Sequence, residues 1–186
     1  LARDGHAVTL VARGAHLAAL RLRGRVRVRE TDGTAWDAPV GAAESPAGRP
    51  DLVIVATKSH DTLPAARDLQ GLEGDCTVLS LQNGVENVER LAGVVGASRV
   101  LGGIAFVGLR IREPGTVDHE AHGRVRIGDP AGTTARAQAA FALLRPSWDV
   151  RLSDDIVHDQ WHKLLWNAGF NAVCAVSGAS AGRALD

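Results

Sequence analysis

Pro50-Asp-Leu-Val-Ile-Val-Ala-Thr-Lys58 is the stretch of this 186-residue chain that decides the fold. From Pro50 to Ala56 it is almost wholly apolar, as in strands that a parallel sheet buries on both faces. It ends in the polar pair Thr57-Lys58, and a helix is expected near 62–69. An apolar strand, a polar tip and a helix make up the repeating unit of α/β proteins.

Two further stretches repeat this unit. His6–Ala12 is a short apolar strand that ends at Arg13, and Cys76–Leu81 is another that ends in Gln82-Asn83-Gly84. Helices are expected after them, over about 15–22 and 85–95. The alternation predicts an α/β fold of the Rossmann type, with a doubly wound sheet.

Polar side chains stand at the ends of these three strands, namely Arg13, Lys58 and Asn83. In doubly wound sheets, ligands bind at the carboxyl ends of the strands. Each residue alone is weak evidence, because strand tips are often polar for solubility. Two cations and a carboxamide together favour a ligand that carries phosphate.

The remaining elements of this domain are more antiparallel in character. They are a hairpin over 24–40 with Asp32-Gly33 at its turn, a loop over 41–50, a long strand over 100–111, short antiparallel partners over 116–119 and 124–128, a helix over 134–144 and a strand over 148–152.

A long helix carries a second polar group, within Trp161-His-Lys-Leu-Leu-Trp-Asn-Ala-Gly-Phe-Asn171. At about 3.6 residues per turn, Lys163, Asn167 and Asn171 fall in one stripe roughly 80° wide among apolar side chains. Such groups need partners, because an unsatisfied polar group in an apolar setting is costly. They face either water, as a solvated stripe, or a polar ligand in a cleft.

We expect Ser153 or Asp154 to cap this helix, and we place a domain boundary there. Residues 1–152 then form the Rossmann-like domain. Residues 153–186 form the first helix of an all-helical domain and are too few for a core of their own. The chain has no Met and Leu1–Gly5 reads as the end of a helix, so we expect a fragment truncated at both ends.

Composition argues against several classes of protein. The 21 basic and 21 acidic residues give a formal charge of zero, which disfavours nucleic acid and membrane surfaces as partners. No apolar run reaches the ~20 residues of a membrane span. Cys76 and Cys174 are expected to be reduced, buried thiols of a cytoplasmic protein. His119 and His122 lie in an expected turn without a third ligand, so no metal site is predicted.

The order of these motifs resembles the ketopantoate reductase (2-dehydropantoate 2-reductase) family over nearly the whole chain. The similarity rests on Gly5–Arg13, Asp51–Lys58, Leu81–Val85, Pro114–His119 and, most specifically, the Lys-x₃-Asn-x₃-Asn spacing that starts at Lys163. It implies NADPH-dependent reduction of ketopantoate to pantoate, a step toward coenzyme A, and is compatible with a homodimer. A paralogue acting on another 2-oxo acid and a non-catalytic dinucleotide-binding module are the alternatives.

The resemblance also implies which residues hold NADP. Arg13 stands where an NAD enzyme carries an acid, and arginine there suits the 2′-phosphate. Lys58 would lie near the adenosine phosphate, and Asn83 near the nicotinamide ribose and the substrate. The competing interpretations are a surface arginine, a solvated lysine and a turn asparagine.

For the chemistry, the resemblance makes Lys163 the general acid, and it assigns Asn167 and Asn171 to the substrate's hydroxyl and carboxylate. A structural lysine is the alternative. Trp161 and Trp166 are expected to form an apolar wall that lowers the pKa of the lysine.

The family's glycine-rich turn and first strand should precede Leu1. We therefore expect a sheet split between its second and fourth strands, and a chain that is inactive alone.

Overall fold

The computed structural model describes residues 1–178 and 183, apart from the side chain of His122. The end of the expected helical segment, 179–182 and 184–186, lies outside the described residues. The strands are β1 (Thr9–Val11), β2 (Arg25–Arg29), β3 (Ala35–Pro39), β4 (Gly41–Ala43), β5 (Leu52–Val55), β6 (Thr77–Ser80), β7 (Val100–Glu113), β8 (Thr116–Gly128) and β9 (Asp149–Leu152). The α-helices are α1 (Gly14–Arg23), α2 (Thr62–Asp68), α3 (Asn87–Val95), α4 (Ala135–Leu144) and α5 (Ile156–Ser177).

The main sheet has seven strands in the order β3-β2-β8-β7-β6-β5, and β9 also pairs with β8. β5, β6 and β7 are parallel, as the apolar strands predict, whereas β8 runs antiparallel to β7. β1 pairs only with β4, in a separate two-stranded sheet. β1 is the strand counted as second and β5 the strand counted as fourth, and the two lie in different sheets. The expected split between them is therefore confirmed.

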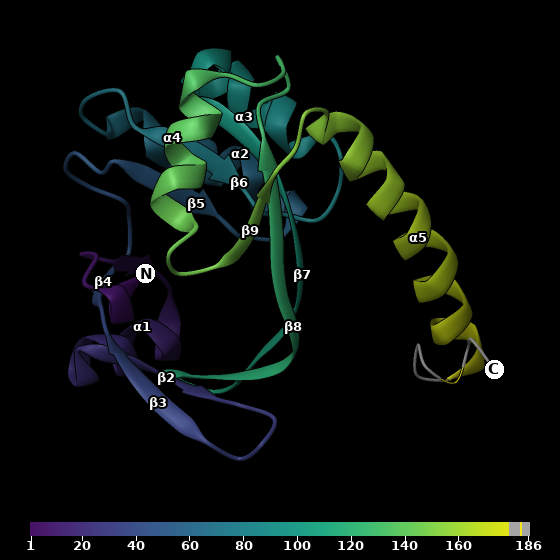
Figure 1. Ribbon diagram of the computed structural model, residues 1–186. Helices are drawn as coiled ribbons and strands as arrows, with labels where there is room; N and C mark the ends of the chain where they lie inside the picture. The colour runs from purple at the N-terminus through teal and green to yellow at the C-terminus, as the bar shows by residue number, and fades with distance from the viewer. Residues whose placement is uncertain (179–182, 184–186) are drawn as a thin grey trace.

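The sheet is covered on both faces, because neighbouring residues of its apolar strands point to opposite sides. Val78 and Val100 pack with α2 and α3, whereas Leu79 and Leu101 pack with α4. Figure 1 shows α4 on one side of the sheet and α2 and α3 on the other. This arrangement confirms the predicted α/β class.

Three expectations about local structure were wrong. Gly41–Ala43 is a strand, β4, whose small residues carry no β-branched signal. The two short partners of β7 are one long strand, β8, which passes through register shifts instead of a turn. The cap of α5 is Asp155, whose Oδ1 accepts from the backbone nitrogen of His158 at 2.9 Å.

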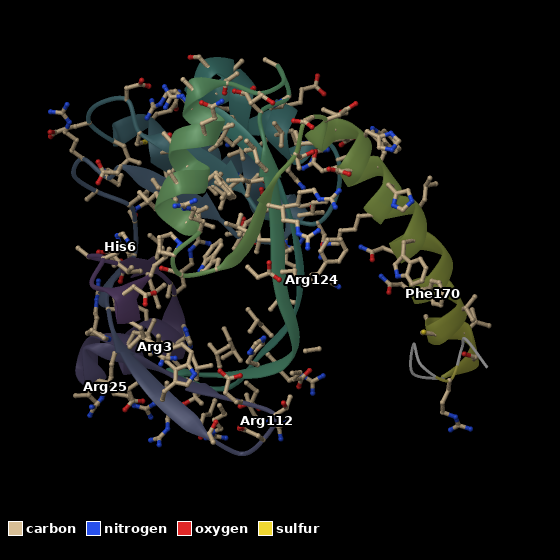
Figure 2. All side chains as sticks on the ribbon, viewed as in Figure 1. Arg3, His6, Arg25, Arg112, Arg124 and Phe170 are labelled. Carbon is tan, nitrogen blue, oxygen red and sulfur yellow. The ribbon has the colours of Figure 1, made fainter. Side chains whose placement is uncertain are left out.

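Helix α5 leaves the body of the molecule after its first turns. In Figure 1 its second half extends away from the sheet, and Figure 2 places Phe170 on that half. Apolar side chains such as Val173 and Val176 are exposed there. The buried residues of α5, Ile156 and Gln160, lie in its first turns. The contact of these turns with the sheet therefore positions the polar stripe of the helix.

Candidate active site

A pair of glycines forms the seat of α5. Gly102 on β7 and Gly128 on β8 are register partners, and Ile156 of the helix is fully buried against them. A Cβ added to Gly128 would lie 2.9 Å from the Cβ of Ile156 and from the carbonyl oxygen of Ser153. Only residues without a side chain allow the helix to approach the strands this closely, which explains Gly102 and Gly128.

Polar contacts fix the rotation of the same helix turn. Asp159 accepts hydrogen bonds at 2.6 Å from Arg126 on β8 and from the hydroxyl of Ser153. Charge-assisted bonds of this length are among the stronger ones in proteins. Since Asp159 is fixed on one side, Lys163, one turn later, must face the strands.

Lys163 is held by two neutral acceptors. Its Nζ donates to Oδ1 of Asn83 at 3.0 Å and to the carbonyl oxygen of Ala105 on β7 at 2.8 Å. It also lies 5.4 Å from the ring centroid of Phe106, within cation–π range. An ammonium has three N–H donors, so one is left for a ligand.

Burial lowers the pKa of Lys163 below its ordinary value, because desolvation disfavours the charged form. The expected wall of Trp161 and Trp166 is not the cause, since these side chains are 52% and 56% exposed. Trp161 is two residues before the lysine and thus points to another side of the helix. Neighbours such as Ile104 and Leu164 lie at the lysine instead.

A cavity of about 340 Å³ lies beside Lys163, between the β6–α3 loop, β7 and α5. Its volume is in the range of small-molecule sites. The polar side chains that line it are Gln82, Asn83, Gln160, Lys163, Asn167 and Asn171. The structure therefore brings together four of the six predicted site residues, and a ligand in a cleft is favoured over a solvated stripe.

A buried hydrogen-bond network holds the loop that carries Asn83. The side chain of Asn87 is 2% exposed, and its Nδ2 donates to the carbonyl oxygen of Asn83 at 2.8 Å. The hydroxyl of Ser59 donates to the same oxygen at 2.6 Å, and the Oδ1 of Asn87 accepts from Thr62 at 2.8 Å. The acceptor for Lys163 is thus set by residues from α2 and α3.

Arg13 and Lys58 do not line the cavity. Arg13 is exposed between β1 and α1, and Lys58 is exposed after β5. Neither cation has an ion-pair or hydrogen-bond partner for its side chain within the described part of the chain. The backbone of Lys58 does reach the site, because its carbonyl oxygen accepts from Gln82 at 3.4 Å.

Sequence reasoning missed two parts of the site. Gln160 is three residues before Lys163, so on a helix it falls in the same stripe, and extending the stripe by one turn would have found it. The carbonyl oxygen of Ala105 has no signal in the sequence, because every residue carries a carbonyl oxygen.

Among the described residues, no group of three metal-binding side chains lies together, and none of the helices is long and apolar enough to cross a membrane.

Comparison with known proteins identifies the family of this chain. The sequence model of the family described as "Ketopantoate reductase PanE/ApbA" matches residues 1–132, and the model of its C-terminal part matches 155–186. The chain belongs to the ketopantoate reductase family. The second match begins next to the start of α5, and residues 133–154 lie between the two matches.

Relatives within the family are similar over most of this chain. A 2-dehydropantoate 2-reductase of Halobacterium salinarum is 35% identical over all of this chain and 63% of its own length. One of Mesorhizobium japonicum is 31% identical over 93% of this chain and 60% of its own. The chain therefore spans about 60% of the curated relatives that it matches.

Solved structures of the family share the fold. A ketopantoate reductase of Ralstonia eutropha superimposes with a TM-score of 0.82 at 31% identity, over 95% of this chain and 58% of its own. The 2-dehydropantoate 2-reductase of Porphyromonas gingivalis gives 0.84 at 25% identity, over 96% and 64%.

Proposed function

We propose that the protein reduces ketopantoate to pantoate with NADPH, at the cavity beside Lys163. The observation that carries this proposal is the desolvated ammonium of Lys163, held by Asn83 and Ala105 at the wall of a cavity. A module that only binds a dinucleotide has no need of a half-buried proton donor. We also place the protein in the cytoplasm, since both cysteines are free, with Cys76 buried and Cys174 half-buried.

Lys163 acts where charge develops in this reaction. Reduction of a ketone places negative charge on its oxygen, and a fixed cation that can give up a proton stabilises that charge and then neutralises it. Asn167 and Asn171 face the same cavity, and their side chains make no hydrogen bond within residues 1–178. Their free carboxamides suit the substrate's hydroxyl and carboxylate.

The residues present also fit a phosphate-bearing nucleotide. Arg13 would hold the 2′-phosphate and Lys58 the adenosine phosphate, because both are exposed cations with free side chains at strand ends. Asn83 would lie near the nicotinamide ribose. When bound, the reduced nicotinamide supplies the hydride, and the chain's own residues orient the ketone and deliver the proton.

The direct test is a steady-state assay of the protein expressed from its complete coding region. NADPH oxidation is followed with ketopantoate and with a panel of other branched and straight 2-oxo acids. We expect the highest kcat/KM for ketopantoate. A higher kcat/KM for another 2-oxo acid would assign the protein to a paralogous reductase, and no oxidation with any of them would refute the reductase.

Arg13 should determine the choice between NADPH and NADH. A charge-assisted hydrogen bond is worth about 1.5–3 kcal/mol, so Arg13→Gln should weaken NADPH binding by about 10-fold to 100-fold and leave NADH binding unchanged. Fluorescence titration of each cofactor measures this. The control is Arg21→Gln, which removes an exposed arginine of α1, the helix that follows Arg13. Arg21 pairs with Glu44, which lies after β4. Equal losses for both cofactors would show that Arg13 does not read the 2′-phosphate.

The pH dependence of turnover should report Lys163. A general acid must hold its proton, so kcat should fall as pH rises through the pKa of Lys163. Burial lowers that pKa from 10.5, and the alkaline limb should therefore lie below pH 10.5. Lys163→Arg should lose this limb along with most of the activity, because a guanidinium keeps its proton. An alkaline limb that is the same in both proteins would come from another group.

A further inference from the structure

Gln160 is a buried polar side chain without a partner. It is 7% exposed, and its carboxamide makes no hydrogen bond with any residue that the structure describes. Gln82, which lines the same cavity, is the opposite case. Its Nε2 donates to Oγ1 of Thr62 at 2.8 Å and to Oγ1 of Thr57 at 3.1 Å, so its carboxamide is used within the protein. The carboxamide of Gln160 is therefore free to bind a ligand that enters the cavity.

Gln160 lies beside β7, where it lines the cavity next to Lys163 and also a second cavity between α3, α4 and the start of α5. A Cβ on Gly102 would lie 3.3 Å from Nε2 of Gln160, so the glycine leaves room for the amide at the strand. Gln160 lines the cavity together with Lys163 and Asn167. On the helix it precedes Lys163 by about one turn, which places it at the end of the polar stripe nearest the sheet.

We propose that Gln160 binds the carboxamide of the nicotinamide ring, an inference that rests on the proposed function. A carboxamide has both a donor and an acceptor, as Gln160 has, so the two groups can satisfy each other with two hydrogen bonds. A carboxylate offers acceptors alone and would leave Oε1 of Gln160 without a hydrogen bond. Reciprocity therefore favours the cofactor's amide over the substrate's carboxylate, and the contact sets the rotation of the ring beside Lys163.

The test is cofactor binding, measured by fluorescence titration without turnover on the protein from its complete coding region. Gln160→Met keeps the length of the side chain and removes its hydrogen bonds. It should weaken NADPH binding about tenfold, as expected for two neutral hydrogen bonds. For the reduced 3-acetylpyridine analogue, in which a methyl group replaces the amide nitrogen, the same substitution should cost clearly less. Gln138→Met, on the exposed face of α4, is the matched control and should leave both affinities unchanged.

The results distinguish failure of the proposed reductase function from failure of the role proposed for Gln160. If the wild type does not bind NADPH, the proposed function fails and this inference fails with it. If the wild type binds NADPH, and Gln160→Met binds NADPH and the analogue as tightly as the wild type does, the inference is overturned while the proposed reductase stands. A raised KM for ketopantoate with an unchanged cofactor affinity would overturn it too, because Gln160 would then read the substrate. Gln160→Asn is a second variant, which keeps a carboxamide. Circular dichroism of Gln160→Met and Gln160→Asn verifies that both proteins fold.

Discussion

Replacing Lys163 by methionine should lower kcat by about 10²-fold to 10⁴-fold, the range for loss of a positioned general acid. Methionine keeps an apolar stem of similar length, so the wall of the cavity, which Ile104 and Leu164 also line, loses little packing. NADPH binding should change little, since Lys163 is assigned to the ketone oxygen, whereas Arg13 and Lys58 are assigned to the phosphates of the cofactor. Steady-state kinetics with ketopantoate and a fluorescence titration of NADPH separate the two effects.

Two comparisons sharpen that experiment. Only two of the 21 basic residues are lysines, Lys58 and Lys163, and the rest are arginines, which cannot give up a proton. Lys58→Met should weaken cofactor binding with little change in kcat, the reverse of the pattern at Lys163. His162→Gln alters an exposed neighbour on the same helix and should be silent. Full turnover in Lys163→Met would remove the lysine from the mechanism.

Substituting Gly128 by alanine should reduce both stability and turnover. The new Cβ would lie 2.9 Å from the backbone oxygen of Ser153 and from Ile156, so α5 must move away from the sheet. Overpacking of this kind costs about 1–3 kcal/mol of unfolding free energy. Lys163 moves with the helix, and a shift of about 1 Å at a catalytic group can cost on the order of 10²-fold in rate.

Urea denaturation and kcat/KM measure the two effects of Gly128→Ala. Gly93→Ala is the matched control, because Gly93 lies in α3 with nothing within 4 Å of the added Cβ. That control should gain up to about 1 kcal/mol, as expected for alanine over glycine in a helix. If Gly128→Ala is as stable and as active as the wild type, the glycine seat does not position α5.

The elements that sequence predicts well here are those with a strong local pattern. The continuous apolar runs of β5 and β6 and the spacing of Lys163, Asn167 and Asn171 depend on residue type and period alone. β4 was missed because Gly41-Ala-Ala43 is held by its partner β1 and has little strand preference of its own.

The parts of the site that sequence could not give depend on distant contacts. The acceptor Ala105 is a backbone group on β7, and the network of Asn87, Ser59 and Thr62 joins residues more than twenty positions apart. The error about Trp161 and Trp166 has a simpler cause. Both were assigned to Lys163 from nearness in sequence. Trp161, two residues before the lysine, points to another side of the helix. Trp166, three residues after it, lies on a neighbouring face but is 56% exposed.

The most direct test of the proposed mechanism is the distance from Nζ of Lys163 to the ketone oxygen, in a crystal structure of the protein with NADP⁺ and ketopantoate. The oxidised cofactor prevents turnover, so the bound ketone is trapped intact. We predict a hydrogen bond of about 2.7–3.2 Å, with Asn83 and Ala105 still bound to the same ammonium. A ketone bound elsewhere, or an ammonium turned into bulk solvent, would contradict the reductase.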